Sequence, residues 1–372
     1  MYGEEQIQFL KNKNYLTEGE SLEDRINDFH KTVKKYEAKY SDGLADRIKD
    51  LIEKQILSPS TPQWSNFGRE MRGNTTPLPV SCNIINYPNS ISGIYYSHGE
   101  AAMLSKLGAG VGANFDNLCE KGTKIDEGFY TNPKLDWIED FAGTTQKVSQ
   151  GSQRRGYGVP FISIEDREFY DIMDRVSKEN SNKHDTLVDN NIGILLPKGF
   201  RDKVRNGDKE AQKRFLTVLQ ERKDTGKIYL VDEDNLNKNQ SEVYSKLGHV
   251  VNSTNICVEA CTPSYDDKTF ACVLTSLNLK HWDIIKKNPQ IIKDAVMFLD
   301  IVVEEYIRLT EGIPFLDKVR KSSIEKRDIG LGTLGFHELL QMNNMAFGDL
   351  RSRVLNKEIY KTIRKYADEA SE

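Results

Sequence analysis

From about residue 77 onward, the sequence alternates short apolar runs with helix-like stretches, and this alternation restricts the fold more than any other feature. Five runs have the length of a β-strand, at residues 80–85, 159–164, 191–196, 227–231 and 270–279. Glycine clusters and helical segments lie between and after them, and the most strongly periodic helix covers residues 290–311. Parallel strands need crossover connections, which are usually helices. The sequence therefore predicts an α/β fold with a mainly parallel sheet.

Residues 1 to about 57 have a helical pattern instead. Leu22, Ile26, Phe29 and Val33 recur at the spacing of one helix face. Pro59 then interrupts the pattern, because proline lacks the amide hydrogen that a helix interior needs. At the other end, residues 356–372 are helix formers up to the last position, which leaves open either a frayed terminal helix or a helix that another polypeptide would continue.

The charge balance and the apolar content exclude several classes of protein. Lysines and arginines number 52 and aspartates and glutamates 56, so the net charge of −4 disfavours binding to duplex DNA or to an anionic membrane. No stretch approaches the roughly 18 consecutive apolar residues of a transmembrane helix. Five cysteines in 372 residues do not form a disulfide framework and are typical of cytosolic thiols. We therefore expect a cytoplasmic protein without nucleic-acid or membrane partners.

The segment from Asn255 to Glu259 is the most informative for function. In an extended backbone, Asn255, Cys257 and Glu259 would share one face, and Ile256 and Val258 the other. The pattern alone leaves two interpretations open. The segment is either a half-buried strand whose polar face meets water, or a reactive thiol beside a general base and a hydrogen-bonding amide. The pentapeptide contains no histidine, so it does not suggest a cysteine–histidine hydrolase.

A zinc module is a further interpretation of the same region. The sequence offers four residues of the types that bind Zn²⁺, namely Cys257, Cys261, Cys272 and His281. Their spacing is not the short paired knuckle of most zinc modules. In addition, strand alternation in the apolar run 270–279 would restrict the direction of Cys272.

Several segments together resemble the large catalytic subunit of class I ribonucleotide reductase. The Asn-x-Cys-x-Glu segment at 255–259, followed by Cys272, is similar to the active-site region of that family. Further similarities occur in family order at residues 59–62, 80–82, 107–112, 149–156 and 328–335. Residues 107–112 resemble the family's glycine turn in the active site. Residues 149–156 resemble the flexible loop that relays the identity of an effector to the substrate pocket.

The resemblance implies that the protein is an oxidoreductase that reduces ribonucleotides to deoxyribonucleotides through a thiyl radical. Cys257 would carry the radical, Glu259 would accept the proton of the substrate 3′-hydroxyl, and Asn255 would hydrogen-bond the substrate. Cys82 and Cys272 would supply the reducing equivalents and end as a disulfide, which requires their Cα atoms to lie within ~7 Å. A radical needs a dry, enclosed pocket, so Cys257 would lie shielded on a loop inside a barrel.

Other positions are implied by the resemblance to bind substrate and effectors. The substrate-binding positions would be Thr61, Ser81 and Gly110. The positions that bind allosteric effectors, deoxynucleoside triphosphates or ATP, would be Asn89, Lys121, Gln150 and Arg154. Asn89 stands where the family usually has an aspartate that binds the effector ribose, and an amide can still form a hydrogen bond there.

The resemblance also implies a fold. Residues 1–75 would form an N-terminal helical region, and residues 76–372 would form about half of a ten-stranded α/β barrel, incomplete and continued by a second chain. The N-terminus would be too short for the family's ATP-binding activity domain, and the second half of the barrel and its paired-cysteine tail would be missing. We therefore expect an N-terminal fragment of a split or truncated large subunit. Split subunits occur in phages, and such a protein would act in the host cytoplasm.

The expected partners follow from the same resemblance. They are a C-terminal large-subunit fragment, a small subunit whose metal centre supplies the radical, a second large subunit in a homodimer, and thioredoxin or glutaredoxin as reductant. We expect no metal or cofactor bound directly to this chain.

Two alternatives within the resemblance stay open. The first is a nucleotide-binding regulatory fragment that is not catalytic. The second is a class II, cobalamin-dependent reductase, which shares the thiol core. Those relatives often have Cys-Gly-Glu at the radical position, and the valine that follows Cys257 here argues against that class.

Overall fold

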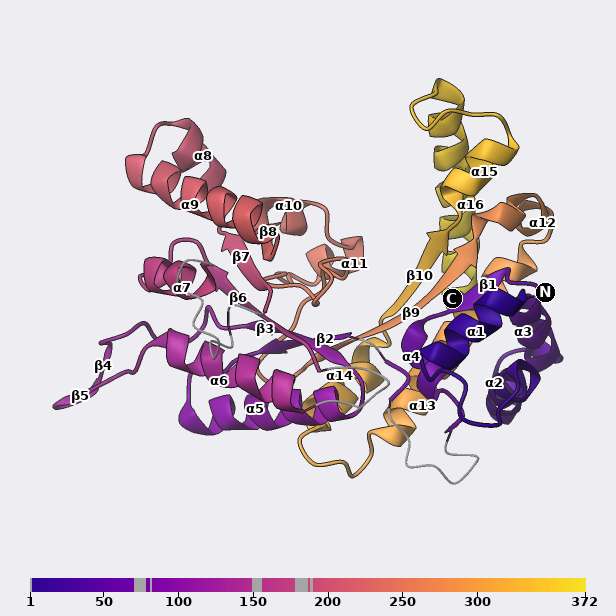
Figure 1. Cartoon of the computed structure of the whole chain (residues 1–372), viewed down its shortest axis with the longest axis horizontal. Coiled ribbons are helices and arrows are strands. Elements are labelled where there is room, and N and C mark those ends of the chain that lie inside the picture. Colours follow the sequence, from indigo (N-terminus) through magenta and orange to yellow (C-terminus); the bar gives the residue numbers. More distant parts are fainter. Residues whose placement is uncertain (1, 70–77, 81, 149–155, 178–186, 188–189) are drawn as a thin grey trace. The chain divides into compact units, whose positions relative to one another are not determined.

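A computed structural model describes residues 2–69, 78–80, 82–148, 156–177, 187 and 190–372 (Figure 1). The chain divides into two units. The sheet unit comprises Cys82–Ala271 and Glu311–Glu325, and the terminal unit comprises Met1–Ser81, Cys272–Thr310 and Lys326–Glu372. Each unit is described by itself below.

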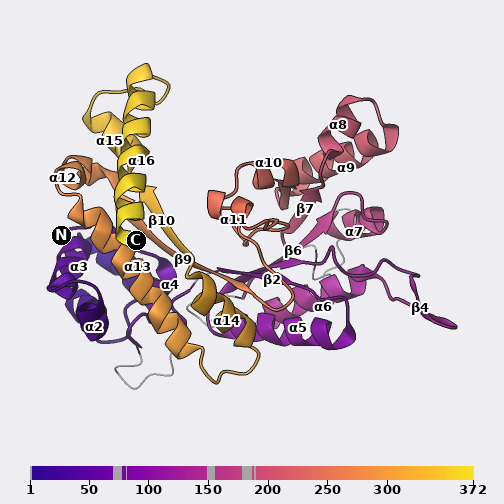
Figure 2. The ribbon, with the colours of Figure 1, turned by 180° about the vertical axis from the view of Figure 1, so that it is seen from behind.

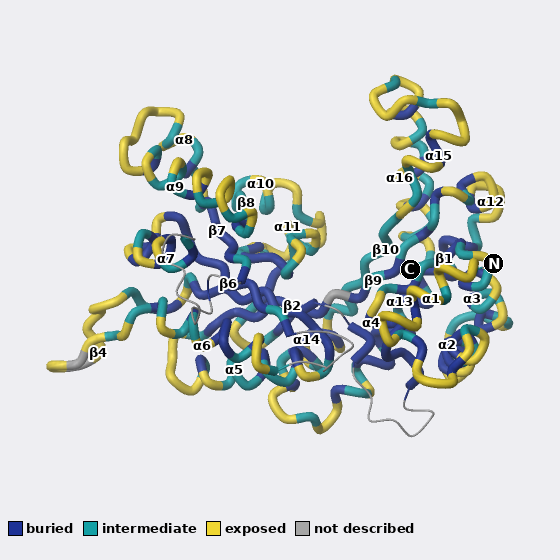
Figure 3. The backbone as a smooth tube through the Cα atoms, viewed as in Figure 1, coloured by how far each residue is buried: buried dark blue, intermediate teal, exposed yellow. Residues whose placement is uncertain are grey.

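Five parallel strands form the centre of the sheet unit. In spatial order they are β2 (Cys82–Asn86), β3 (Gly110–Asn114), β6 (Gly158–Ser163), β7 (Ile192–Leu196) and β8 (Ile228–Asp232). Every residue of the first four strands is buried, as Figure 3 shows by their dark blue colour. Burial of a parallel sheet on both faces explains why these strands appear in the sequence as continuous apolar runs rather than as alternating ones.

Helices connect the strands of the sheet unit and cover its sheet. They are α5 (Ile91–Lys106), α6 (Lys134–Lys147), α7 (Phe169–Val176), α8 (Phe200–Arg205), α9 (Lys209–Thr225), α10 (Glu233–Lys238), α11 (Glu242–Lys246) and α14 (Asp317–Lys326, whose last residue belongs to the terminal unit). In both views α5 packs on β2 and β3 and α6 packs on β6, along the same face of the sheet (Figures 1 and 2). A two-stranded hairpin of β4 (Lys124–Asp126) and β5 (Phe129–Tyr130) lies between β3 and α6 in the sequence.

The terminal unit combines both ends of the chain. Its helices are α1 (Glu4–Asn12), α2 (Leu22–Tyr36), α3 (Leu44–Glu53), α4 (Thr61–Asn66), α12 (Trp282–Lys287), α13 (Gln290–Leu309), α15 (Phe336–Met342) and α16 (Leu350–Ser371). Strand β9 (Phe270–Asn278) begins in the sheet unit and continues into the terminal unit. There it pairs antiparallel with β1 (Leu57–Pro59) and parallel with β10 (Ile329–Leu334).

A buried arginine fixes helix α4 against helix α2. The Arg25 guanidinium has no exposed surface and donates 2.7 Å hydrogen bonds to the carbonyl oxygens of Gln63, Trp64 and Phe67. It also lies over the Phe29 ring, 4.6 Å from the centroid. These carbonyls belong to the end of a short helix, where backbone oxygens lack intrahelical donors, and the planar fork of an arginine satisfies several of them at once.

The observed elements confirm the predicted fold class, an α/β fold with an N-terminal helical region and a mainly parallel sheet. The five predicted strand runs correspond to β2, β6, β7, β8 and β9, and the periodic segment 290–311 corresponds to α13. The predicted glycine turn at 107–112 is wrong in its second half, because Gly110 to Gly112 form the start of strand β3. The predicted division into residues 1–75 and 76–372 differs from the two units and stays a prediction. Within the described residues, no helix is both long and apolar enough to cross a membrane.

Candidate active site

A tight loop after α11 carries Cys257, and Asn255 holds this loop together. Asn255 is completely buried, and its side-chain Oδ1 accepts a 3.0 Å hydrogen bond from the backbone N–H of Ala260. Its backbone carbonyl accepts a 3.1 Å hydrogen bond from the N–H of Val258. An asparagine that bonds the backbone a few residues away replaces the ladder partners that a strand would supply. Asn255 therefore closes the loop around Cys257.

The two apolar residues of the loop lie against the core of the sheet unit. Ile256 and Val258 pack on a cluster of buried side chains from three strands, namely Val159, Phe161, Leu195 and Val231. Residues 257 and 259 therefore face away from that cluster. The structure agrees with the predicted separation of Cys257 and Glu259 from Ile256 and Val258, but not with the predicted place of Asn255, which is buried. The segment is also a turn rather than an extended strand.

Glycines in strand β3 allow the loop to approach the sheet. A Cβ at Gly110 would lie 2.3 Å from Ile256 Cδ1, and a Cβ at Gly112 would lie 2.3 Å from the carbonyl oxygen of Thr254. Both distances are well below van der Waals contact, so only glycine permits this packing. Gly110, predicted to contact substrate, has the Ile256 side chain beside it, and its role in substrate binding stays a prediction.

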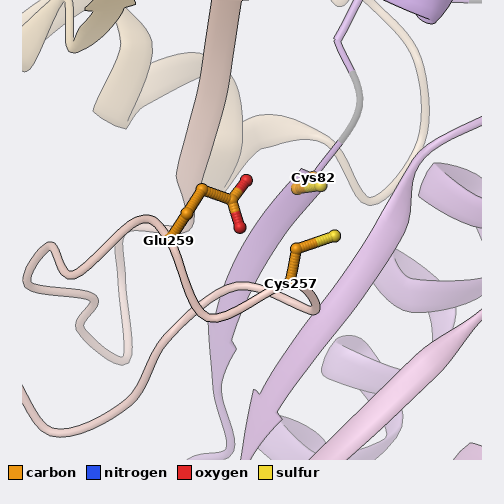
Figure 4. Close-up of side chains that lie close together, drawn as sticks. All are labelled: Cys82, Cys257 and Glu259. Carbon is orange, nitrogen blue, oxygen red and sulfur yellow. The ribbon is translucent and has the colours of Figure 1, made fainter. Parts of the chain in front are cut away.

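Val258 has an unusual backbone conformation that directs its neighbours. Its φ is +64°, in the left-handed region. A β-branched residue pays about 1–2 kcal/mol for this conformation, and such strain persists only where the surroundings enforce it. The positive φ reverses the chain between Cys257 and Glu259, so the two side chains emerge on the same side of the loop (Figure 4).

Two thiols and a carboxylate from distant parts of the sequence meet at this loop. The Sγ atoms of Cys82 and Cys257 and a carboxylate oxygen of Glu259 all lie within 4.8 Å of one another. Figure 4 shows Cys82 at the start of β2 and the other two side chains on the loop, all directed into one space. The strand register explains the meeting, because Cys82 is paired with Gly110, the residue on which Ile256 rests.

The exposure of these three groups differs from the expectation of a shielded radical position. Cys82 is 4% exposed, whereas Cys257 and Glu259 are exposed within the described structure. They are exposed because the loop uses Ile256 and Val258 for its contacts with the core, which leaves residues 257 and 259 on the open side. The expected shield belongs to a complete barrel, of which this chain would form about half, so it stays a prediction.

One buried polar group in the Cys257 loop lacks a hydrogen-bond partner among the described residues. The buried Nδ2 of Asn255 has no hydrogen-bond acceptor among the described residues. A buried donor without an acceptor costs about 1–3 kcal/mol, so such a group in a native site calls for an explanation. The predicted function of Asn255, a hydrogen bond to the substrate, is one explanation, while its Oδ1 is already used by Ala260.

Several predicted site residues cannot be assigned to this cluster. Cys272 is the third residue of β9, in the terminal unit, and its pairing with Cys82 stays a prediction. Thr61 is the first residue of α4, also in the terminal unit. Ser81, Gln150 and Arg154 lie outside the described residues.

A pocket of about 360 Å³ in the sheet unit contains one of the predicted effector residues. Asn89 lines it, and its amide is held by Cys119, whose backbone N–H donates to Oδ1 at 3.0 Å and whose Sγ accepts from Nδ2 at 2.8 Å. Lys124 and Trp137 also line this pocket. Lys121 does not line it, and its backbone N–H donates to Glu168 instead. The roles of Asn89 and Lys121 in effector binding stay predictions.

The residues of the zinc hypothesis do not meet among the described side chains. The group of potential ligands that does converge consists of Cys82, Cys257 and Glu259, without Cys261 or His281. Burial, together with the negative charge of Glu259, raises the pKa of the Cys261 thiol, which makes this thiol a poorer metal ligand at neutral pH.

Sequence analysis missed one buried acid. Glu100 on α5 is completely buried, and burial raises its pKa to about 8. Neither carboxylate oxygen has a hydrogen-bond partner within the described structure. The signal available in the sequence is weak, because a glutamate is common on the exposed face of any helix. Only the packing of α5 on the sheet shows that this face is covered.

A family model described as ribonucleotide reductase, barrel domain, matches residues 80–214 and 205–372 of the chain. The ribonucleoside-diphosphate reductase large subunit of Invertebrate iridescent virus 3 is 24% identical to the chain over 398 residues, and the match covers 87% of this chain and 60% of that protein. The vitamin B12-dependent ribonucleoside-diphosphate reductase of Thermoplasma acidophilum is 22% identical over 350 residues, with coverage of 88% of this chain and 43% of that protein.

A solved structure is similar over almost the whole chain. The Actinobacillus ureae class Id ribonucleotide reductase alpha subunit superimposes with a TM-score of 0.88 at 28% sequence identity, and the match covers 99% of this chain and 66% of that one. This chain thus spans less than two thirds of the length of each of these three proteins.

Proposed function

The chain belongs to the ribonucleotide reductase barrel-domain family, and on this premise we propose that it supplies the radical loop of a reductase that converts ribonucleotides to deoxyribonucleotides. The observation that carries this proposal is the meeting of Cys82, Cys257 and Glu259 within 4.8 Å. These two thiols and the carboxylate are three of the four groups that the reaction needs, with Cys272 as the fourth, because a hydrogen atom, a proton and a pair of electrons must all move at one sugar.

In the proposed reaction, a thiyl radical on Cys257 removes the 3′-hydrogen of the ribose. Glu259 takes the proton of the 3′-hydroxyl, and the 2′-hydroxyl leaves as water with a proton from a cysteine thiol. Cys82 and Cys272 together give two electrons and two protons and become a disulfide. The 3′-hydrogen then returns from Cys257 to the sugar. The sum is one ribonucleotide and two thiols converted to one deoxyribonucleotide, one water and one disulfide.

The unpartnered amide supports a role for Asn255 in this scheme. Its Nδ2 is buried and directed by the hydrogen bond that Oδ1 accepts from Ala260. A substrate hydroxyl or the Glu259 carboxylate would complete its hydrogen bonding when substrate binds. Asn255 would therefore both close the loop and orient the sugar.

The proposal also includes further subunits. A thiyl radical reacts with water-borne reductants and oxygen, so the exposed Cys257 requires a cover during turnover. We propose that the rest of the large subunit provides this cover, since the chain spans about 60% of the viral relative. A radical-generating small subunit, a second large subunit and a thioredoxin or glutaredoxin complete the proposed assembly. The pocket around Asn89 would bind the effector nucleotide.

Reconstitution tests the proposal. The chain would be combined with a C-terminal large-subunit complement and a small subunit, and deoxyribonucleotide formation measured. The Cys257→Ser and Cys82→Ser variants should lose turnover while retaining substrate binding. The Cys261→Ser variant should retain both turnover and substrate binding. Turnover that survives Cys257→Ser would contradict the assignment of the radical to this position.

A second candidate function is a regulatory fragment that binds nucleotides without catalysis. The pocket around Asn89 favours it, because this pocket lies in the sheet unit and needs none of the thiols. Binding of deoxynucleoside triphosphates without turnover in the complete assembly would support it. A cobalamin-dependent reaction is the other alternative, since one relative is named as vitamin B12-dependent. Turnover that requires adenosylcobalamin instead of a small subunit would identify that class.

A further inference from the structure

We propose that Cys82, Cys257 and Glu259 form a binding site for a thiophilic divalent cation such as Zn²⁺, and that occupation of this site switches the reactive thiols off. Sequence spacing does not indicate this set of ligands, because the zinc hypothesis drawn from the sequence combined Cys257 with Cys261, Cys272 and His281 and included neither Cys82 nor Glu259. The inference rests on how the folded chain brings three ligand atoms together.

The geometry fits a small tetrahedral ion. All three ligand atoms lie within 4.8 Å of one another. Around Zn²⁺, with bonds of about 2.3 Å to sulfur and about 2.0–2.2 Å to oxygen, neighbouring ligand atoms stand roughly 3.3–3.8 Å apart. Contraction by about 1 Å is enough to close the site, and rotation of the exposed Cys257 and Glu259 side chains provides it without moving β2.

The ligand types select the class of cation. Two sulfur atoms favour borderline-soft and soft ions such as Zn²⁺ and Cd²⁺ over Mg²⁺ and Ca²⁺, which prefer oxygen ligands. Two thiolates and one carboxylate carry a total charge of −3. A divalent cation reduces the net charge of the site to −1, which lowers the cost of holding the two thiolates beside the buried strand β2. Three protein ligands also leave the fourth position of Zn²⁺ for water, as in sites that exchange their metal and ligands.

The surroundings allow the ion to enter. Cys257 and Glu259 are exposed, and Figure 4 shows both side chains directed toward the Cys82 thiol from the open side of the loop. Cys82 is 4% exposed and belongs to a strand whose residues are all buried. It would therefore be the fixed ligand, and the exposed side chains of Cys257 and Glu259 would rotate toward it. The hydrogen bond between Ala260 and Asn255 and the packing of Ile256 on the core hold the loop in place without a bound metal.

A bound ion would block the proposed chemistry. Metal binding replaces the S–H protons of Cys82 and Cys257 by metal–sulfur bonds and releases these protons to solvent. No oxidant or reductant takes part, and a chelator reverses the step. Without its S–H hydrogen, Cys257 cannot form a thiyl radical by loss of a hydrogen atom, and Cys82 has neither the proton nor the free sulfur that the proposed reaction uses. This inhibitory consequence rests on the proposed function, whereas the binding site does not.

The test is a titration of the intact, reduced chain with Cd²⁺ in the absence of oxygen, followed by the ultraviolet charge-transfer absorption of cadmium–thiolate bonds. We expect one tightly bound Cd²⁺ per chain, displaced by Zn²⁺ and not by Mg²⁺. Because loss of even an outer partner of a metal ligand weakens binding by about 10–100-fold, Cys82→Ser and Cys257→Ser should each weaken it by at least about 100-fold. Glu259→Gln should weaken it by about tenfold, since the thiolates remain.

Matched controls come from the other thiols. Cys119→Ser, in the pocket around Asn89, and Cys261→Ser, four residues beyond Cys257, should leave the affinity and the stoichiometry unchanged. Binding that survives Cys82→Ser, or that is lost with Cys261→Ser, would overturn the site proposed here. Circular dichroism of each variant excludes loss of folding as the cause.

A second measurement separates this inference from the proposed function. In the reconstituted reductase, Zn²⁺ should inhibit turnover at the concentrations at which it displaces Cd²⁺, and a chelator should restore it. Tight binding to the three residues without inhibition would contradict the switch and leave the site intact. Turnover that depends on Cys257 in a protein that binds no Cd²⁺ would overturn the site and leave the proposed function intact.

Discussion

The side chain of Ile256 occupies the space beside Gly110, so that a Cβ at position 110 would lie 2.3 Å from Ile256 Cδ1. This contact joins the loop that carries Cys257 to the strand that pairs with the start of β2, where Cys82 lies. The absence of a side chain at position 110 therefore lets the loop with Cys257 lie against the strand next to Cys82.

Gly110→Ala should displace the loop and lower turnover of the reconstituted enzyme by about 100-fold, because a displacement of about 1 Å can cost that much in catalysis. A second substitution in the same chain, Ile256→Ala, should restore much of the lost turnover, because it removes the side-chain atoms that the Cβ at position 110 would meet. The control is Gly348→Ala, where an added Cβ meets nothing within 4 Å. Equal turnover of Gly110→Ala and wild type would show that the contact has no effect on the site.

Val258→Gly should impair function with little net change in stability. It relieves about 1–2 kcal/mol of left-handed strain, but the extra freedom of glycine costs roughly 0.5–1 kcal/mol and the contact of the Val258 side chain with the core cluster is lost as well. Turnover should fall, since the reversal that aligns residues 257 and 259 becomes one of many conformations. Urea unfolding gives the free energy. The exposed Val250→Gly, which has no such strain to relieve, should lose stability.

Glu259→Gln should reduce turnover by on the order of 10²–10⁴-fold, the usual contribution of a general base, because an amide cannot accept the 3′-hydroxyl proton. Substrate affinity should change little. The matched control is Glu242→Gln on α11 of the same unit, whose exposed ion pair with Lys246 contributes little to stability. A Glu259→Gln enzyme with normal turnover would exclude the carboxylate as the base.

Glu100 should make stability depend on pH in the direction opposite to that of a paired acid. Burial raises its pKa from 4.5 to about 8, outweighing the positive charge of Lys318. Between these two values the folded state holds a proton that the unfolded state has lost, so stability falls as pH rises from about 5 to 8 and levels off above that. The loss amounts to as much as about 1.4 kcal/mol per pH unit.

Glu100→Gln imitates the protonated acid and should remove this dependence. Urea unfolding of both proteins at several pH values between 5 and 8 measures the difference, which should widen in favour of the variant as pH rises. Parallel stability curves for the two proteins would mean that Glu100 titrates normally in the folded state.

Arg25→Ala should destabilise the terminal unit by about 3–5 kcal/mol, because it removes the donor to three backbone carbonyls and breaks the buried ion pair with Asp28. Lys31→Ala on the exposed face of the same helix should change stability by less than about 0.5 kcal/mol. Denaturant unfolding followed by tryptophan fluorescence is suitable, because Trp64 belongs to the segment that Arg25 holds. Similar losses in the two variants would contradict a specific role for Arg25.

Much of the fold could be predicted because its strands are buried on both faces. Such strands appear in the sequence as unbroken apolar runs, and β6, β7 and β8 lie where those runs occur. Strand β3 was predicted as a turn, since glycine is rare in strands and common in turns. The glycines of β3 make room for the Cys257 loop. This is a contact between segments distant in the sequence, which rules based on local sequence do not predict.

The candidate site was predictable in its residues but not in its geometry. The Asn-x-Cys-x-Glu pattern identified Cys257 and Glu259, and alternation assigned them to one face. In the structure, the two side chains share a side because the backbone of Val258 has a positive φ. Valine disfavours this conformation locally, and only tertiary packing enforces it. The proximity of Cys82 to Cys257 came from the family resemblance and could not come from spacing. Glu100 could not be identified at all, because its burial depends on which face of α5 the sheet covers.

Ile256 and Val258 anchor the Cys257 loop to the hydrophobic core of its own unit, and the consequence concerns timing. The same collapse that folds the unit also brings the two thiols and the carboxylate together. On the proposed function, association with other subunits would decide when these three groups react, whereas their proximity is settled as soon as the polypeptide has folded.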